Sequence, residues 1–167
     1  RPGLAEPKRP DDAAIFKDYP ADPQSLAGLF ESRLAVLKGE LYKVRDKSAA
    51  ASRVLALVES AGGGRCLAHS DPLIEEVVSS RPELSQIVDR VASKPLDSPS
   101  FAAYAAGIST ADFLVARTGS VVLRSSRAGG RRLTVLPPLH IVLARPAHLV
   151  LSLEDTLEDL HADGSWS

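Results

Sequence analysis

The order of the apolar segments in the first half of the chain constrains its fold most strongly. Asp22-Pro23 and Asp71-Pro72 each join a residue that caps helices to a proline suited to the first helical turn. Apolar residues at helical spacing follow both pairs and recur over 48–60, while short apolar segments at 41–44 and 66–68 suit strands. Strands joined through helices pair in parallel with right-handed crossovers. The sequence therefore predicts an α/β fold of three layers around a mixed, largely parallel sheet.

The second half of the chain continues this alternation, with one change of pattern. The expected elements are helices over 82–94 and 101–107 and strands over 113–116, 141–143 and 149–151. Gly129 and Gly130 separate two segments of alternating residues, 121–124 and 131–135. That arrangement predicts a hairpin, and hence some antiparallel pairing.

Length and composition are those of one soluble globular domain. The 167 residues are 44% hydrophobic and 25% charged, with a formal net charge of -1. This balance supplies no overall field that attracts nucleic acid or an acidic membrane surface, so we expect neither as a partner. No apolar segment approaches the ~20 residues of a membrane span, and the first residues do not resemble a secretory signal. We therefore expect a cytoplasmic protein.

Residues 1–20 differ from the rest of the chain because they are rich in proline and charge and poor in apolar residues. This composition is typical of a tail on the protein surface, and an arm that reaches a partner subunit is the alternative. We therefore divide the chain into an N-terminal arm or tail at 1–20 and a single α/β domain at 21–167.

Cysteine and glycine usage argues against a cofactor site built by this chain alone. Cys66 is the single cysteine, whereas an iron–sulfur cluster needs about four protein ligands. No pair of histidines or cysteines has the spacing of a metal site. Gly62, Gly63 and Gly64 follow a helix and precede a strand, which is the reverse of a phosphate-binding loop. We expect them to end the helix.

The segment 108–143 carries the polar residues best suited to a binding site, because polar residues where strands end are positioned by the strands. Its two polar clusters are Arg117-Thr118-Gly119-Ser120 and Pro137-Pro138-Leu139-His140. Gly119 permits a ligand to approach the backbone, and the flanking hydroxyl and N–H groups can donate to an anion. Arg117 can bind a carboxylate or phosphate in a bidentate manner. The alternative is a tight turn with an exposed arginine.

His140 is held by the prolines before it, and its neutral imidazole can act as a general base or donate to a carboxylate. A histidine satisfied within the core is the more frequent alternative. Asp112 can pair with Arg117, orient His140 or cap a turn, and the last role is favoured. Ser120 as a nucleophile needs His140 as base and Asp112 as orienting acid, but no nucleophile-elbow pattern supports it.

The candidate residues are therefore few. The expected ligand-binding residues are Asp112, Arg117, Thr118, Gly119, Ser120, Pro138 and His140, with His140 and Ser120 as candidate catalytic residues. His69, His148 and His161 lie in no comparable setting. Arg124, Arg127, Arg131 and Arg132 bracket the expected hairpin turn and are interpreted as solvated, with a contact to a coenzyme phosphate or a partner as the alternative.

The segment from Thr110 to Leu157 resembles the LUD domain of lactate-utilisation protein C and its relatives. The shared pieces are ADFLVARTGSVVL, a turn that contains glycine, LPPLHIVL and LSLEDTL, in this order and spacing. The resemblance implies a fold similar to that of sugar-phosphate isomerases and coenzyme A transferases. Two features depart from it. Arg117 stands where relatives usually have an acidic residue, and relatives continue into a further strand, so we expect this chain to lack its last C-terminal segment.

The same resemblance implies a role in oxidising L-lactate to pyruvate, as a subunit of a complex whose iron–sulfur clusters lie on partner subunits. Two alternatives stay open. One is a stand-alone enzyme or binder for an anionic metabolite, namely a sugar phosphate, a carboxylate or a coenzyme A thioester. The other is a non-catalytic assembly factor. A deep pocket lined by Arg117, Ser120 and His140 would favour the stand-alone enzyme, whereas exposed apolar surface near the hairpin would favour the complex or the assembly factor.

Overall fold

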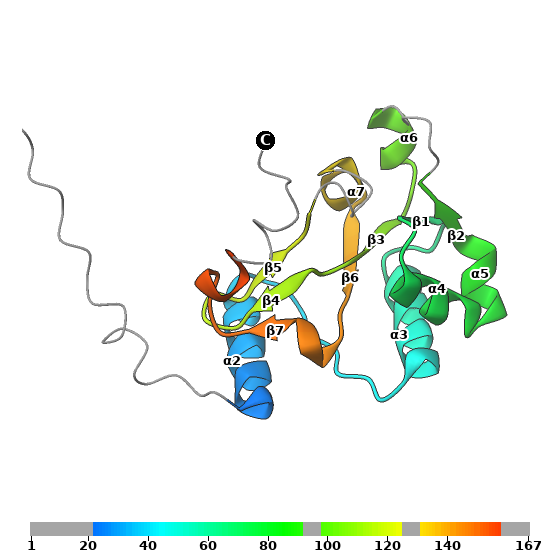
Figure 1. Ribbon diagram of the computed structural model, residues 1–167. Helices are drawn as coiled ribbons and strands as arrows, with labels where there is room; N and C mark the ends of the chain where they lie inside the picture. The colour runs from blue at the N-terminus through cyan, green and yellow to red at the C-terminus, as the bar shows by residue number, and fades with distance from the viewer. Residues whose placement is uncertain (1–21, 92–97, 125–130, 158–167) are drawn as a thin grey trace, which may run out of the picture.

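The structure, a computed structural model, describes residues 22–91, 98–124 and 131–157. Within these ranges the chain forms two β-sheets, and helices lie on both faces of the larger one (Figure 1). The arm or tail expected at 1–20 lies outside the described residues. Among the helices described, none combines the length and the apolar character needed to cross a bilayer.

The three helices of the first half begin where the sequence indicates. They are α2 (Pro23–Val36), α3 (Lys47–Ser60) and α4 (Pro72–Ser79). The aspartates before them, Asp22, Asp46 and Asp71, each accept a backbone N–H from the first turn, which satisfies a donor that has no helical partner. Gly62, Gly63 and Gly64 all have positive φ after α3, so they end this helix as expected.

The larger sheet, sheet A, is entirely parallel and has the strand order β2-β1-β3-β6. Its strands are β1 (Cys66–Ala68), β2 (Val88–Arg90), β3 (Ala106–Thr110) and β6 (Leu139–Leu143). The two central strands are buried, and a parallel sheet of this kind needs cover on both faces. The predicted α/β fold with a largely parallel sheet is thus confirmed.

Alternating side chains of sheet A enter two different cores. Cys66, Ala68 and Ile108 pack with residues of α3, α4 and α5 (Pro82–Ile87) on one face. Leu67 points to the other face. There it packs against Phe101 of α6 (Ser98–Ala102) and Leu133 of α7 (Arg131–Val135). Helices, sheet and helices therefore form three layers.

The smaller sheet, sheet B, has the order β5-β4-β7. It consists of β4 (Phe113–Val115), antiparallel β5 (Ser120–Val122) and parallel β7 (Leu149–Val150). Leu26 and Phe30 of α2 pack against its side chains. Two 3-10 turns, η1 (Pro146–His148) and η2 (Glu154–Thr156), flank β7.

Four expected elements differ from the structure. Residues 41–44 form no strand, because Tyr42 and Val44 are exposed and pair with no neighbouring strand. The helix expected over 82–94 ends at Ile87, and Val88–Arg90 instead forms β2 beside β1. Whether each segment forms a strand thus depends on whether it pairs with a neighbouring strand, and the local sequence does not show such pairing.

The other two differences concern the segments around Gly107. Residues 101–107 were expected to be helical, but α6 ends at Ala102 and β3 begins at Ala106. Residues 131–135 were expected to be the second strand of a hairpin with 121–124, but they form α7, and β5 pairs with β4 instead. Leu133 is buried against sheet A, and a single buried residue in five does not distinguish a helix from a strand.

Gly107 permits α7 to lie directly on β3. A Cβ at this position would lie 2.2 Å from the carbonyl oxygen of Leu133, a backbone atom that cannot turn aside. The contact matters for the fold because α7 covers one face of the sheet and leads into β6.

We predict that Gly107→Ala lowers the free energy of unfolding by about 1–3 kcal/mol, because the added methyl group forces α7 away from β3. Gly28→Ala is the control, since a Cβ at this exposed helical position meets nothing within 4 Å. It should stabilise the protein by about 0.5–1 kcal/mol. Urea unfolding of both variants measures the difference, and equal midpoints would contradict the close contact.

Candidate functional site

The strand order of sheet A leaves a crevice at the carboxyl ends of β1 and β3. After β1 the chain continues to β2, which lies on one side of β1 in the sheet. After β3 it continues through sheet B and α7 to β6, which lies on the opposite side of the sheet. The connections that follow β1 and β3 therefore run in opposite directions from this edge. Such a point, where the strand order reverses, is where open α/β sheets bind their ligands.

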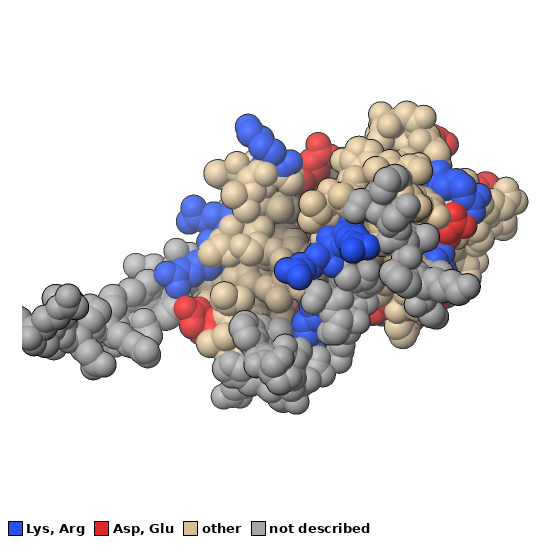
Figure 2. Space-filling model, turned by 90° about the horizontal axis from the view of Figure 1, so that it is seen from above, with Lys and Arg blue, Asp and Glu red and all other residues tan. Residues whose placement is uncertain are grey.

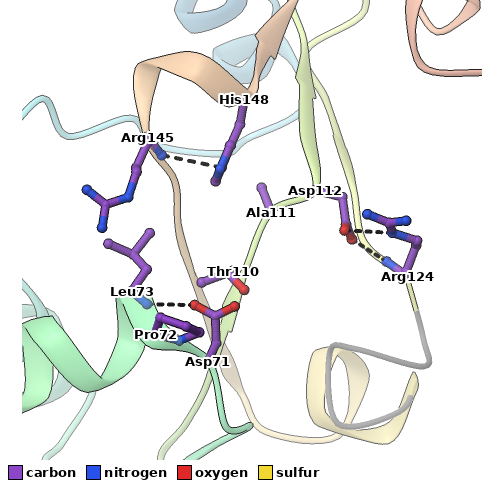
Figure 3. Close-up of a pocket in the computed structure, with 9 residues that line it drawn as sticks. All are labelled: Asp71, Pro72, Leu73, Thr110, Ala111, Asp112, Arg124, Arg145 and His148. Carbon is purple, nitrogen blue, oxygen red and sulfur yellow. Dashed lines mark hydrogen bonds and ion pairs between the residues drawn. The ribbon is translucent and has the colours of Figure 1, made fainter. Parts of the chain in front are cut away.

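A pocket of about 370 Å³ opens at this edge (Figure 3). Its volume suits a small metabolite. The residues that line it are Asp71, Pro72, Leu73, Thr110, Ala111, Asp112, Arg124, Arg145 and His148. All of them follow the carboxyl end of a strand or form that end, so the fold brings together residues from distant parts of the sequence.

A buried ion pair forms one wall of the pocket. The carboxylate of Asp112 accepts two hydrogen bonds from Arg124, one from the backbone N–H and one from Nε, each 2.7 Å long. The two side chains are 9% and 14% exposed. The backbone N–H of Asp112 also donates to Val122 at 2.9 Å. Asp112 thus anchors β5 and its following residues, and its partner is Arg124 rather than Arg117, the arginine that the sequence suggested.

Arg145 and His148 form the opposite wall, in the segment after β6 (Figure 3). Arg145 donates from Nη2 to both carboxylate oxygens of Glu76, at 3.1 Å each. Its backbone N–H points to Nδ1 of His148 at 3.4 Å. Both side-chain bonds that Arg145 makes within the described ranges use Nη2, so Nε and Nη1 can donate to a ligand.

Asp71 and Thr110 line the pocket between these two walls. One oxygen of Asp71, Oδ1, accepts the N–H of Leu73 at 2.8 Å as the cap of α4, which fixes the direction of the carboxylate. Its second oxygen, Oδ2, can therefore accept from a ligand. Thr110 is the last residue of β3, and its Oγ1 lies 3.1 Å from Nε2 of His69.

His69 lies behind Thr110 at the end of β1. The residue is 4% exposed, and its Nδ1 has no hydrogen-bond partner among the residues described. Burial lowers the pKa of His69 below its usual value, although the negative charges of Asp71 and Asp112 and the backbone carbonyl of Ile108 act in the opposite direction. The ring is therefore neutral at pH 7.

The segment Arg117-Thr118-Gly119-Ser120 lies elsewhere, at the turn between β4 and β5 in sheet B. Thr118 Oγ1 donates to Ser120 Oγ at 2.9 Å. Gly119 has φ 70°, and a Cβ there would lie 2.5 Å from the backbone nitrogen of Leu34. The glycine therefore permits close packing of the turn on α2, and this segment does not line the pocket.

His140 and Pro138 lie in a third location. Pro138 is exposed and directly precedes β6, while His140 in β6 stands opposite Gly107 of β3. Nε2 of His140 lies 2.7 Å from Oγ of Ser109, and burial lowers the pKa of the imidazole. The sequence-predicted residues thus separate into the turn of sheet B, the Ser109–His140 pair and Asp112 in the pocket.

The sequence pointed to Asp112 as a ligand-binding residue and to Arg124 only as one of the arginines around the expected turn, and it singled out no other residue of the pocket or of the layer behind it. His69, Asp71, Thr110, Arg145 and His148 each lie at or just after the end of a strand of sheet A or in the turn that follows. A signal for them existed, because carboxyl ends of parallel strands meet at one edge. This signal requires that β3 be identified as a strand, whereas the sequence predicted a helix over 101–107.

The described residues do not fit an iron–sulfur cluster. Cys66 is fully buried in β1, and burial raises the pKa of its thiol to about 11, which keeps it protonated at neutral pH. No group of three or more His, Cys, Asp or Glu side chains in the described ranges is arranged to hold a metal ion.

Comparison with known proteins gives two matches. The sequence model of the LUD domain family matches residues 28–165. The fold is similar to the crystal structure of a DUF162 family protein from Deinococcus radiodurans, with a TM-score of 0.67 and 17% sequence identity over 87% of this chain and 84% of that chain. No curated protein sequence matches this chain. The structural similarity concerns the fold alone.

The buried histidines predict a pH dependence of stability. Burial lowers the pKa of His140 in the folded state, so below about pH 6.5 the unfolded chain binds a proton that the native chain does not. The free energy of unfolding should therefore fall as the pH is lowered from 7 to 5. His140→Gln removes this contribution, and urea unfolding at both pH values should show a smaller loss than in the wild type. An equal loss would contradict a buried, neutral His140.

Proposed function

The chain belongs to the LUD domain family, which is associated with lactate utilisation, and from this premise we propose that it is a subunit of a complex that oxidises L-lactate to pyruvate. In this proposal the pocket at the carboxyl edge of sheet A binds the small hydroxy acid. The iron–sulfur clusters lie on partner subunits, and the complex works in the cytoplasm.

The arrangement of charges in the pocket is the observation that supports a hydroxy acid. Asp112 and Arg124 neutralise each other within their buried pair. Arg145 is paired with Glu76 through Nη2, and its Nε or its Nη1 can each donate a charge-assisted hydrogen bond to a carboxylate. Asp71 remains as an acceptor suited to a hydroxyl group. A 2-hydroxy carboxylate offers both groups in one small molecule.

The same arrangement favours L-lactate over pyruvate. Pyruvate has a keto oxygen where lactate has a hydroxyl group, so it cannot donate a hydrogen bond to the carboxylate of Asp71. Two acceptors that face each other repel, and sites built around a hydroxyl group therefore reject analogues that lack it. A subunit with this preference would hold the substrate and release the product.

Partner subunits enter the proposal because of the redox chemistry. Oxidation of lactate to pyruvate removes two electrons and two protons, and the electrons must pass to an acceptor that the described residues of this chain do not fit. Val135 at the end of α7 is 74% exposed, but a single exposed apolar side chain is common on protein surfaces and does not itself favour a partner. Nucleic acid is not part of the proposal, because the chain has a formal net charge of -1. On the face seen from above, Lys and Arg lie in separate groups (Figure 2).

We predict that the purified chain binds L-lactate and that Arg145→Ala weakens binding about tenfold or more, because the carboxylate loses its charged partner. The matched control is Arg45→Ala, since Arg45 is a largely exposed arginine that does not line the pocket. Isothermal titration calorimetry with L-lactate and pyruvate measures both variants. Equal affinity of wild type and Arg145→Ala for L-lactate would contradict this assignment.

The role within a complex needs a separate test. The protein and its Arg145→Ala variant are each isolated from the cells that make them, and bound iron and lactate-oxidising activity are assayed. The proposal expects iron-containing partners with both proteins but activity only with the wild type. Partners without lactate oxidation in the wild type, or recovery of the chain alone, would contradict it.

A further inference from the structure

We infer that Thr110 contacts the ligand in the pocket and that His69, behind it, sets the direction in which the Thr110 hydroxyl donates. The pair forms a chain of donors that runs from Nε2 of His69 through Oγ1 of Thr110 to an oxygen of the ligand. This inference rests on the proposed function for the class of ligand, a small carboxylate, and adds a residue that recognises it.

The positions of the two side chains support this order. Thr110 ends β3 and lines the pocket, whereas His69 follows β1 and is 4% exposed. A ligand can therefore reach the threonine hydroxyl but not the imidazole. Nε2 and Oγ1 are 3.1 Å apart, and Thr110 has no other side-chain hydrogen bond among the residues described.

The unpartnered nitrogen of His69 indicates which way the hydrogen bond runs. A neutral imidazole carries its hydrogen on one of its two nitrogens. Hydrogen on Nδ1 would leave a buried N–H donor with no acceptor in hydrogen-bond geometry among the described residues, and such donors are rare. Hydrogen on Nε2 leaves only a lone pair without a partner and lets Nε2 donate to Thr110. We therefore assign the tautomer with hydrogen on Nε2.

This tautomer has a direct consequence for Thr110. Its oxygen accepts from His69, so its own hydrogen cannot return to Nε2 and is available to the pocket. A hydroxyl group that already accepts a hydrogen bond is a better donor. Its natural partner is an oxygen with negative or partial negative charge, such as one of the carboxylate oxygens of the ligand. Burial supports the arrangement, since it lowers the pKa of His69 and keeps the ring neutral.

Ser109, the residue before Thr110 in β3, provides a matched control. Ser109 is fully buried, and its Oγ lies 2.7 Å from Nε2 of His140, so it also forms a hydroxyl–imidazole pair. Neither Ser109 nor His140 lines the pocket. Ser109→Ala therefore removes a similar interaction from the same strand without removing a group that a ligand can reach.

The experiment combines nitrogen NMR of the histidine rings with titrations of acetate, L-lactate and inorganic phosphate into the full chain. In the free wild type, long-range proton–nitrogen spectra should show His69 with its hydrogen on Nε2. Thr110→Val should weaken binding of whichever anions bind by about tenfold or more, whereas Thr110→Ser should restore it. Ser109→Ala should leave binding unchanged, and circular dichroism confirms that each variant is folded.

The outcomes separate this inference from the proposed function. If acetate or phosphate binds and L-lactate does not, the lactate assignment fails while the effect of Thr110→Val still tests the inference. Unchanged binding in Thr110→Val would overturn the inference, as would hydrogen on Nδ1 of His69 in the free protein. A wild type that binds none of the three anions would overturn it as well.

Discussion

Parallel pairing in sheet A is the constraint on which the rest of the structure depends, because a parallel sheet needs helices on both of its faces and a crossover between successive strands. On one face this cover comes from α3, α4 and α5, and on the other from α6 and α7. Gly107 gives α7 access to β3, since its lack of a Cβ admits the Leu133 carbonyl. The same pairing aligns the carboxyl ends of β1, β3 and β6 at one edge, and the pocket lies there.

Sheet B contributes to the pocket through the largely buried ion pair of Asp112 and Arg124. Arg124 follows β5, and its guanidinium and backbone N–H both bind the carboxylate of Asp112, directly after β3. A pair this well buried is favourable only when its hydrogen bonds are satisfied, so the geometry of the wall is tightly defined. The pair also removes one charge of each sign from the pocket. Asp71 and Arg145, the latter paired with Glu76, are the other two charged residues that line the pocket.

The sequence predicted the fold class and most helix starts, because capping aspartates and apolar spacing are local signals that sheet A reinforces. It predicted helix for the residues of β2 and for the start of β3, whereas pairing with β1 makes these segments strands. The error at 101–107 affected the prediction of the site, because the expected helix overlapped the start of β3 and Thr110 was therefore not recognised as the end of a strand. Gly119 was read as a place for a ligand, yet its positive φ and close approach to Leu34 serve packing on α2. Asp112, one of the expected ligand-binding residues, lines the pocket, but its partner Arg124 lies across a strand pairing that the sequence did not reveal.

The central claim is that the edge of sheet A between Asp71 and Arg145 holds a small hydroxy carboxylate. A crystal structure of the chain soaked with L-lactate tests it most directly. The account predicts the lactate carboxylate on the Arg145 guanidinium and the hydroxyl on Asp71, with Thr110 in hydrogen-bond contact. Lactate bound instead at the turn of Arg117 and Ser120, with the pocket empty, would contradict the account.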